Sequence, residues 1–372
     1  MQDLQGVSIY LIRIVIVRFR NYPKCDERRY ISKTARKLNL KSNMFECSGI
    51  DPFAQIHKLN KLFDEPAPSV ASYRINYLLE KASKMGFGVI LDGHDGDSTL
   101  SHGLGYLPVL ARAGKWFELW VNIYGLSKVF GYSPIRMFGD YLNHYKLNNS
   151  TQLNRALGKN KRRLTAKFHL SDNQTLWDAL PNDLAVVTHA RLKESGFYDV
   201  KGITEKESHI EFLTQPMQSY VLEALDKIAA SHGIELRYPF FDKRLAEFCV
   251  GLPTHLKLKN GLSRIILRSA MSGRLPNIVI NRLHKTNFAP LIVQDAKSLS
   301  QPVINNVLGT PFAIINKLIN LHTVRKSWDI FKLKPNAENL DVVYPAIAAT
   351  DWLTQYQDEI DNSTGETSGT SL

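Results

Sequence analysis

Carboxylates and glycines alternate in the segment DGHDGD, which begins at residue 92 and directly follows a short apolar run. Its three carboxylates are Asp92, Asp95 and Asp97, and they surround Gly93 and Gly96. Glycine lets a backbone turn with positive φ and brings N–H groups close to phosphate oxygens. Carboxylates repel phosphate, but they can hold Mg²⁺, which bridges them to a nucleotide. The segment is therefore typical of a phosphate-and-metal loop, and equally of an Asx-rich surface turn without a ligand.

Two further clusters of charged residues lie in the last third of the sequence. Glu235, Arg237 and Asp242 flank the aromatic segment YPFF, and an apolar stripe with helical spacing follows them. A string of cations comes next: Arg264, Arg268, Arg274, Arg282, His284 and Lys285. Periodicity alone favours a core position for the first cluster and a solvated basic face for the second. A Ca²⁺ loop at DGHDGD is not favoured, because the required glutamate at its twelfth position is absent.

The chain is long enough, at 372 residues, for one large or two medium domains. Its composition, 44% hydrophobic and 22% charged, is ordinary for a soluble globular protein. No apolar run reaches the roughly 18 residues that a membrane span needs. The nearest candidate, residues 7–17, is interrupted by Arg13 and lacks the cleavage site of a signal peptide. We therefore expect a cytoplasmic protein without a membrane partner.

The formal net charge of +12 suits an anionic partner such as a nucleotide or a nucleic acid. A basic run, KNKRRLTAK at residues 159–167, is interpreted either as a solvated helix end or as a contact for such a partner. Nucleic-acid binding is the less favoured function, because no recognisable binding motif accompanies the charge. The three cysteines are widely spaced and suggest neither a disulfide framework nor a metal site.

Strand and helix patterns alternate along the first third of the chain. A long β-branched run at residues 7–19 predicts a buried strand, and residues 43–47 and 88–91 predict two more. Helical spacing occupies the intervening segments, residues 26–40, 56–63 and 73–86. Strands separated by helices predict an α/β fold with a doubly wound parallel sheet.

Beyond residue 103 the pattern becomes mainly helical, with no strong strand signal. Helices are predicted at residues 107–130, 222–233, 243–252, 263–271 and 345–356. We therefore expect a nucleotide-binding α/β domain over residues 1–103 and a mainly α-helical region over 104–357. Residues 358–372 are poor in apolar side chains and predict a disordered tail.

Taken in order, several stretches resemble the synthetase domain of the asparagine synthase family, a branch of the ATP-pyrophosphatase (adenine nucleotide alpha hydrolase-like) fold. The stretches are residues 25–40, 64–69, 89–103, 235–248, 263–285 and 344–356. Any one of them would be a weak signal, whereas their colinear order is specific. The likeness covers most of residues 15–356.

This resemblance implies an ATP-dependent amide ligase that uses ATP and Mg²⁺. Such enzymes adenylate a carboxylate, release pyrophosphate and let an amine attack the acyl-adenylate. The turn that begins at residue 92 matches the family's pyrophosphate loop, and Asp97 falls at a magnesium-binding aspartate. Lys285 falls on the family's catalytic lysine, whose fixed charge would stabilise the negative charge that develops during reaction. The implied nucleotide and pyrophosphate contacts are Asp92, Gly93, Asp95 and Gly96.

His94 departs from the family pattern, which has a glutamate at this position in asparagine synthetases and a tyrosine in β-lactam-forming members. An imidazole titrates near neutral pH, so His94 could act as the acid or base for the attacking amine. It could equally be a hydrogen-bonding residue of the loop. The sequence HDGDSTLSHG resembles enzymes of peptide and polysaccharide modification, such as lasso peptide cyclases, more than asparagine synthetases. Asparagine biosynthesis and a related amidation therefore both stay open as the function.

Two family features are absent from the sequence. There is no N-terminal glutamine-hydrolysing domain, and the phosphate-binding turn Ser-Gly-Gly-Leu-Asp-Ser does not occur. The resemblance thus implies that residues 1–103 lack the first, central strand of the nucleotide-binding sheet. We expect that a separate chain supplies the missing loop and a glutaminase; the alternative is a truncated, non-catalytic remnant or subunit.

Overall fold

The computed structural model describes residues 13–18, 22–23, 25–131, 133–145, 177–194, 204–283, 286–309 and 313–356. Three sequence predictions lie outside these residues: the tail at 358–372, the basic run at 159–167 and the role of Lys285. The beginning of the strand predicted at residues 7–19 also lies outside them.

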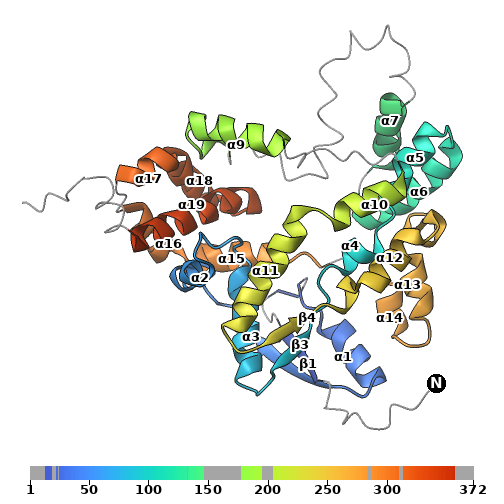
Figure 1. Cartoon of the computed structure of the whole chain (residues 1–372), viewed down its shortest axis with the longest axis horizontal. Helices are drawn as coiled ribbons and strands as arrows, with labels where there is room; N and C mark the ends of the chain where they lie inside the picture. Colours follow the sequence, from blue (N-terminus) through green and yellow to red (C-terminus); the bar gives the residue numbers. More distant parts are fainter. Residues whose placement is uncertain are drawn as a thin grey trace, which may run out of the picture.

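The described strands form three separate pairs (Figure 1). Two pairs are parallel and one is antiparallel: β1 Arg13–Arg18 with β2 Lys41–Glu46, β3 Val89–Leu91 with β4 Glu235–Arg237, and β5 Leu258–Lys259 with β6 Leu262–Ser263. The single doubly wound sheet that the alternating pattern predicts is therefore not confirmed. Beyond residue 103, where the sequence shows no strong strand signal, the short strand β4 returns to pair with β3.

The helices of the first third follow the predicted pattern closely. They are α1 Arg28–Lys37, α2 Ile56–Phe63 and α3 Ser72–Ser83. The later helices are α4 Gly96–Leu100, α5 Tyr106–Arg112, α6 Trp116–Phe130, α7 Pro134–Tyr145, α9 Asn182–Glu194, α10 Glu205–Leu213, α11 Pro216–Ala230, α12 Lys243–Gly251, α13 Ile265–Ala270, α14 Asn277–Ile280, α15 Ala289–Leu299, α16 Gln301–Gly309, α17 Ala313–Leu318, α18 Leu321–Leu333 and α19 Ala337–Gln355.

The helix predicted over residues 107–130 is two helices. The break falls at Gly114, whose φ of 69° is left-handed, and the amide of Lys115 donates to the carbonyl of Leu110. This arrangement is a common helix C-terminal cap, because glycine adopts the left-handed conformation without a steric penalty. The break lets α6 fold back against α5.

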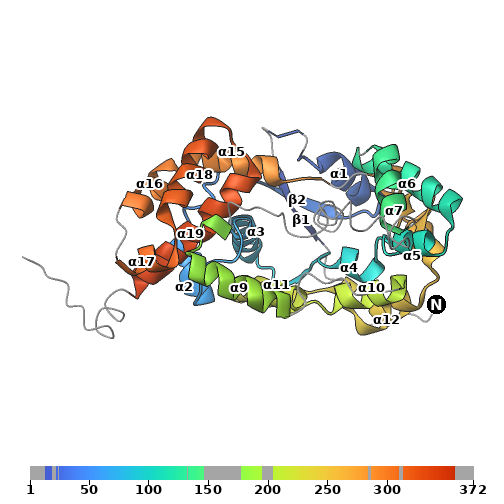
Figure 2. The same ribbon diagram turned by 90° about the horizontal axis from the view of Figure 1, so that it is seen from above.

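The largest hydrophobic core joins segments that are far apart in sequence. It contains residues of α2, α3, α11 and the C-terminal helices, together with Phe53 just before α2, whose ring meets that of Tyr344 of α19 edge to face at 5.3 Å. Figure 2 shows the C-terminal helices on one side of the molecule and α4 to α7 on the other. A smaller core lies between α5, α6 and Leu258 of β5.

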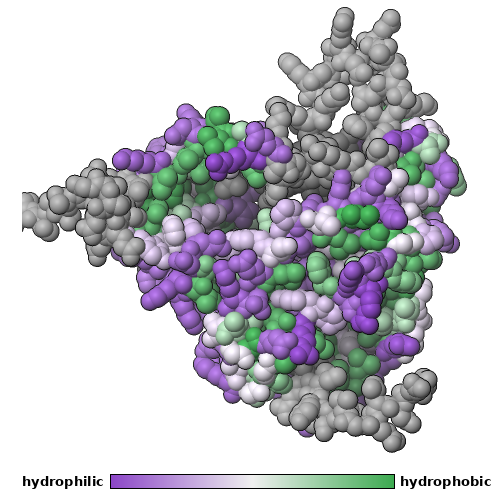
Figure 3. All heavy atoms as spheres, in the orientation of Figure 1, coloured by the Kyte–Doolittle hydropathy of each residue, from purple (hydrophilic) through white to green (hydrophobic). Residues whose placement is uncertain are grey.

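The face drawn in Figure 3 is a mixture of hydrophilic and hydrophobic areas. Two apolar residues of β3 are exposed, Val89 by 45% and Leu91 by 63%. Within the part of the chain that the structure describes, no helix combines the length and apolar character needed to cross a membrane.

Candidate active site

The turn with the sequence DGHDGD leaves the carboxyl end of β3, beside the carboxyl end of β4. The amide of Asp92 donates to the carbonyl of Arg237 at 2.8 Å, so the pairing of the two strands extends into the turn. The side chain of Asp92 then accepts a hydrogen bond from the amide of His94 at 2.9 Å. Ligands of open α/β sheets bind at the carboxyl ends of the strands, where this turn lies.

The left-handed residue of the turn is Asp95, with φ of 58°, and neither Gly93 nor Gly96 has a positive φ. The predicted conformation of the two glycines is therefore wrong. An aspartate tolerates this conformation better than most side chains do. Gly96 instead leaves room for a neighbouring ring: a Cβ at this position would lie 3.2 Å from Phe240, a tight contact.

Asp95 and His94 lie side by side at the start of α4. The His94 Nε2 is 3.5 Å from the Asp95 Oδ2, and the hydroxyl of Ser98 donates to the Asp95 Oδ1 at 3.3 Å. Burial raises the pKa of Asp95, although the neighbouring imidazole opposes the shift. His94 is partly exposed and its ring meets that of Tyr238 edge to face. The arrangement pairs a carboxyl with an imidazole that solvent can reach.

Asp97, in the first turn of α4, faces Arg264, the first member of the basic string. The Asp97 Oδ1 is 2.6 Å from the Nη2 of Arg264, and the Asp97 Oδ2 is 3.8 Å from the Nε2 of His102. The same guanidinium nitrogen lies 3.0 Å from the Nε2 of His102. Asp97 and His102 belong to one segment, and Arg264, 162 residues after His102, joins them in a partly exposed polar cluster at the turn.

Arg264 reaches this position because it follows the hairpin of β5 and β6. The hairpin turn is Asn260-Gly261, with φ of 53° and 75°, which is the backbone that the dipeptide Asn-Gly favours between strands. Arg264 itself is left-handed, with φ of 56°, and begins α13. The Asn-Gly dipeptide is the signal by which sequence reasoning could have placed Arg264 after a tight turn.

In the described part of the chain the basic string is only partly a solvated face: Arg274 is exposed, whereas Arg264, Arg268 and Arg282 are half-buried. Arg268 is partly buried and donates to the carbonyls of Ser263 and Arg282, each at 2.9 Å. The guanidinium of Arg282 lies 2.7 Å from the carboxylate of Glu27, which precedes α1. Lys285 and His284 lie outside the described residues, and the segment just before them is held by these contacts.

The charged residues around the YPFF segment have local partners. Glu235 and Arg237 pair with each other at 2.8 Å. Asp242 accepts from the amide of Arg244 at 2.9 Å and forms the N-cap of α12. The side-chain hydrogen bond from Arg244 lowers the pKa of Asp242 to about 2. This segment therefore packs Phe240 against the turn, while its carboxylates pair with arginines of the same segment.

The donor set fits Mg²⁺ only in part. Among the described residues, no three histidine, cysteine or acidic side chains gather as a metal site. Mg²⁺ bound together with a nucleotide often uses one or two carboxylates and takes its remaining ligands from water and phosphate. Asp97, partly exposed and beside the turn, has the chemistry of one such carboxylate.

Comparisons with known proteins point to one family. The model of the asparagine synthase family matches residues 4–353. Asparagine synthetase [glutamine-hydrolyzing] 1 of Bacillus subtilis is 38% identical over 66 residues, which are 18% of this chain and 10% of that protein. The asparagine synthetase [glutamine-hydrolyzing] of Gallus gallus is 30% identical over 89 residues, 23% of this chain and 16% of that protein.

The human asparagine synthetase [glutamine-hydrolyzing] is 28% identical over 89 residues, again 16% of that protein. The matched segments thus cover less than a fifth of each relative, whereas the family model spans nearly the whole of this chain. The chain therefore belongs to the asparagine synthase family.

Proposed function

We propose that this chain forms amide bonds by activating a carboxylate with ATP and Mg²⁺, releasing pyrophosphate, and transferring the acyl group to an amine. The supporting observation is the turn at Asp92, which follows a parallel strand and ends in Asp97 beside the guanidinium of Arg264. A carboxylate and a cation at this edge suit a magnesium–pyrophosphate group. The carboxylate would hold the metal, and the cation would contact phosphate oxygens.

In this proposal the metal neutralises phosphate charge and the protein's side chains orient the reactants. Asp97 would hold Mg²⁺, and the turn residues Asp92, Gly93, Asp95 and Gly96 would border the nucleotide and its pyrophosphate. The amide of His94 is already used by Asp92, so this donor holds the turn in shape. A turn fixed in advance requires little reorganisation when charge develops on the leaving pyrophosphate.

His94 is proposed as the group that takes a proton from the attacking amine. Its Nε2 lies near the carboxyl of Asp95, which can orient the ring, and its exposure leaves room for a substrate. Lys285 is proposed as the fixed cation at the tetrahedral intermediate. This assignment rests on its position in the RLHK motif.

The unpaired strand edges favour a further element in this site. Among the described residues β1 pairs only with β2 and β3 only with β4. Helix α3 lies against β1 and α11, and α11 lies against β4, so both strand pairs share one helical layer (Figure 1). The exposed Val89 and Leu91 leave the free edge of β3 open to a further strand, and an unpaired strand edge is a ready template for such pairing.

We therefore propose that another parallel strand pairs between β1 and β3 and carries the Ser-Gly-Gly-Leu-Asp-Ser loop. That strand would cover the exposed Val89 and Leu91 and would complete the phosphate cradle. The amine, or a glutaminase that provides ammonia, would come from a further partner.

Carboxylate-dependent exchange of radiolabelled pyrophosphate into ATP tests the proposed reaction. The chain would be measured alone and together with a strand-and-loop segment that carries Ser-Gly-Gly-Leu-Asp-Ser, against aspartate and a panel of peptide and sugar carboxylates. We expect exchange above background for at least one carboxylate when the segment is present. Background exchange with every carboxylate in both preparations would contradict the proposal.

A further inference from the structure

A buried charged network lies behind α4, away from the turn. Its members are Lys257 with 0% exposure, Glu205 with 5% and His209 with 3%. Lysine and glutamate are almost never fully buried without a partner, because removing a charge from water is costly. These residues come from the segment before β5 and from α10, so the network joins two distant parts of the chain.

The contacts form one continuous chain of hydrogen bonds. The Nζ of Lys257 donates to the Glu205 Oε2 at 2.8 Å and to the Nδ1 of His209 at 3.1 Å. The other oxygen of Glu205 accepts from the hydroxyl of Ser101 at 3.1 Å, and Ser101 follows α4 with a positive φ of 55°. A glutamate thereby holds a serine in a conformation that is unfavourable for its side chain.

His209 caps the end of α4. Because its Nδ1 accepts from Lys257, the proton resides on Nε2, which donates to the carbonyls of Ser98 at 2.9 Å and Thr99 at 3.1 Å. The last carbonyls of a helix have no partner within it, and α4 is a helix of five residues. Burial and the charge of Lys257 lower the pKa of His209 and favour this neutral form.

The backbone of Lys257 contacts the segment that carries Arg264. Its carbonyl accepts from the amide of Arg264 at 2.6 Å. A Cβ at Gly103 would lie 3.0 Å from the Cβ of Lys257 and 2.8 Å from that of Leu258, so the segment after α4 is packed against this backbone. Lys257 therefore contacts His209, which caps the helix that carries Asp97, and it also holds the backbone of Arg264. Asp97 and Arg264 are the ion pair beside the turn.

We propose that Lys257 is a positioning residue of the pyrophosphate site, which sets Asp97 through His209 and α4 and sets Arg264 through its own carbonyl. The effect of Lys257 on pyrophosphate binding rests on the proposed function. Its support of α4 and Arg264 rests on the described contacts alone. Without the ammonium group, Glu205 would be a buried carboxylate without its cation, and both α4 and Ser101 would lose a fixed support.

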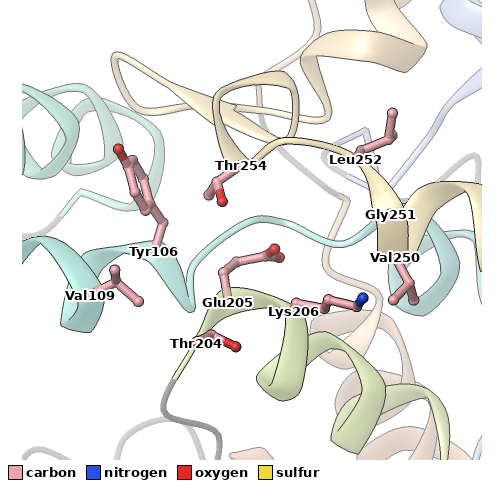
Figure 4. Close-up of a pocket in the computed structure, with 9 residues that line it drawn as sticks. All are labelled: Tyr106, Val109, Thr204, Glu205, Lys206, Val250, Gly251, Leu252 and Thr254. Carbon is pink, nitrogen blue, oxygen red and sulfur yellow. The ribbon is translucent and has the colours of Figure 1, made fainter.

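Lys206 offers a matched control. It lies next to Glu205 in α10 but is exposed, and it lines a pocket of about 230 Å³ that opens on that side of the network (Figure 4). The substitutions Lys257→Met and Lys206→Met remove the same group, one from the buried network and one from the surface.

The experiment is amide hydrogen exchange of the full chain, compared between residues 93–103 and α19. We expect Lys257→Met to speed exchange of residues 93–103 at least tenfold relative to α19, and Lys206→Met to leave both unchanged. Should Lys257→Met fail to fold, the pair His209→Ala and His209→Gln replaces it. His209→Ala is then expected to speed exchange in the same segment, and His209→Gln, which keeps an N–H donor, to restore much of the protection. Equal changes in both regions, or none in residues 93–103, would overturn the proposal.

Calorimetry with pyrophosphate and Mg²⁺ separates this inference from the proposed function. If the unaltered chain binds pyrophosphate, we expect Lys257→Met to weaken the affinity at least tenfold and Lys206→Met to leave it unchanged; equal weakening by both variants would contradict the positioning role. If the unaltered chain does not bind pyrophosphate, the proposed function loses its support, and hydrogen exchange alone decides whether Lys257 positions α4.

Discussion

The close approach of α6 to the β5–β6 hairpin makes Gly125 a decisive position. A Cβ at Gly125 would lie 2.0 Å from the carbonyl oxygen of Asn260 and 2.7 Å from its carbonyl carbon. Side-chain carbons do not approach backbone atoms to less than 3.0 Å, so the hairpin would have to move by about 1 Å or more. The amide of Gly261 also donates to the Oδ1 of Asn122 at 3.2 Å, and that bond would be strained.

The magnitude follows from two opposing effects. Forced overpacking typically costs about 1–3 kcal/mol, and a shift of the backbone tends toward the upper value. Alanine is better than glycine in a helix interior by about 1 kcal/mol, which offsets part of this cost. We expect Gly125→Ala to lower the free energy of unfolding by about 1–2 kcal/mol. Because the hairpin lies between Lys257 and Arg264, the same change should also weaken pyrophosphate binding.

Equilibrium unfolding in urea measures this effect, with Gly139→Ala as the matched control. Gly139 lies inside α7, and a Cβ there meets nothing within 4 Å, so its substitution should raise stability by up to about 1 kcal/mol. A Gly125→Ala protein that is as stable as the Gly139→Ala protein would refute the argument that the hairpin packs directly on α6.

Three further substitutions test other parts of the molecule. Burial raises the pKa of Asp295 from 3.8 to about 6. The free energy of unfolding therefore falls by about 3 kcal/mol as pH rises from about 4 to 6. Urea unfolding measured from pH 4 to 7 should show that Asp295→Asn abolishes this loss. Asn60 is fully buried and bonds Ala67 and Ala348, so Asn60→Leu should cost about 2–4 kcal/mol by the same assay, and an unchanged value would contradict the role of these bonds. His94→Gln should reduce product formation between pH 6 and 9 in a preparation that is active in pyrophosphate exchange, and full activity across that range would make His94 a structural residue.

The periodicity of the first third was sufficient to place its elements. The helix predicted at residues 56–63 has the same bounds as α2, because its apolar positions repeat with helical spacing and a breaker follows at once. By contrast, β4 has three residues, which are too few to display any period. Its strand conformation depends on pairing with β3, whose paired residues lie 146 positions earlier in the sequence. No local pattern predicts that partner.

The position of the turn in the candidate site could be predicted from the sequence, and the roles assigned to its residues stay predictions. The turn and Asp97 could be found, because aspartate and glycine at this spacing after an apolar run are unusual. The contact between Asp97 and Arg264 could not be found, since the sequence places Arg264 in a string of cations that resembles a solvated face. Lys257 gave no signal, because burial of a lysine depends on a carboxylate from another helix. The Asn260-Gly261 hairpin was a local signal that the sequence did carry.

The proposed function requires that the turn and Asp97 bind the phosphates of ATP through Mg²⁺. The most direct measurement is a calorimetric titration of the chain with MgATP, together with its Asp97→Asn and Asp242→Asn variants. Asp242 is a suitable control because its carboxylate is engaged in capping α12 and in an ion pair with Arg244. We predict that the chain binds MgATP, that Asp97→Asn weakens binding at least tenfold, and that Asp242→Asn has little effect. Equal affinity of the unaltered chain and Asp97→Asn would contradict this prediction.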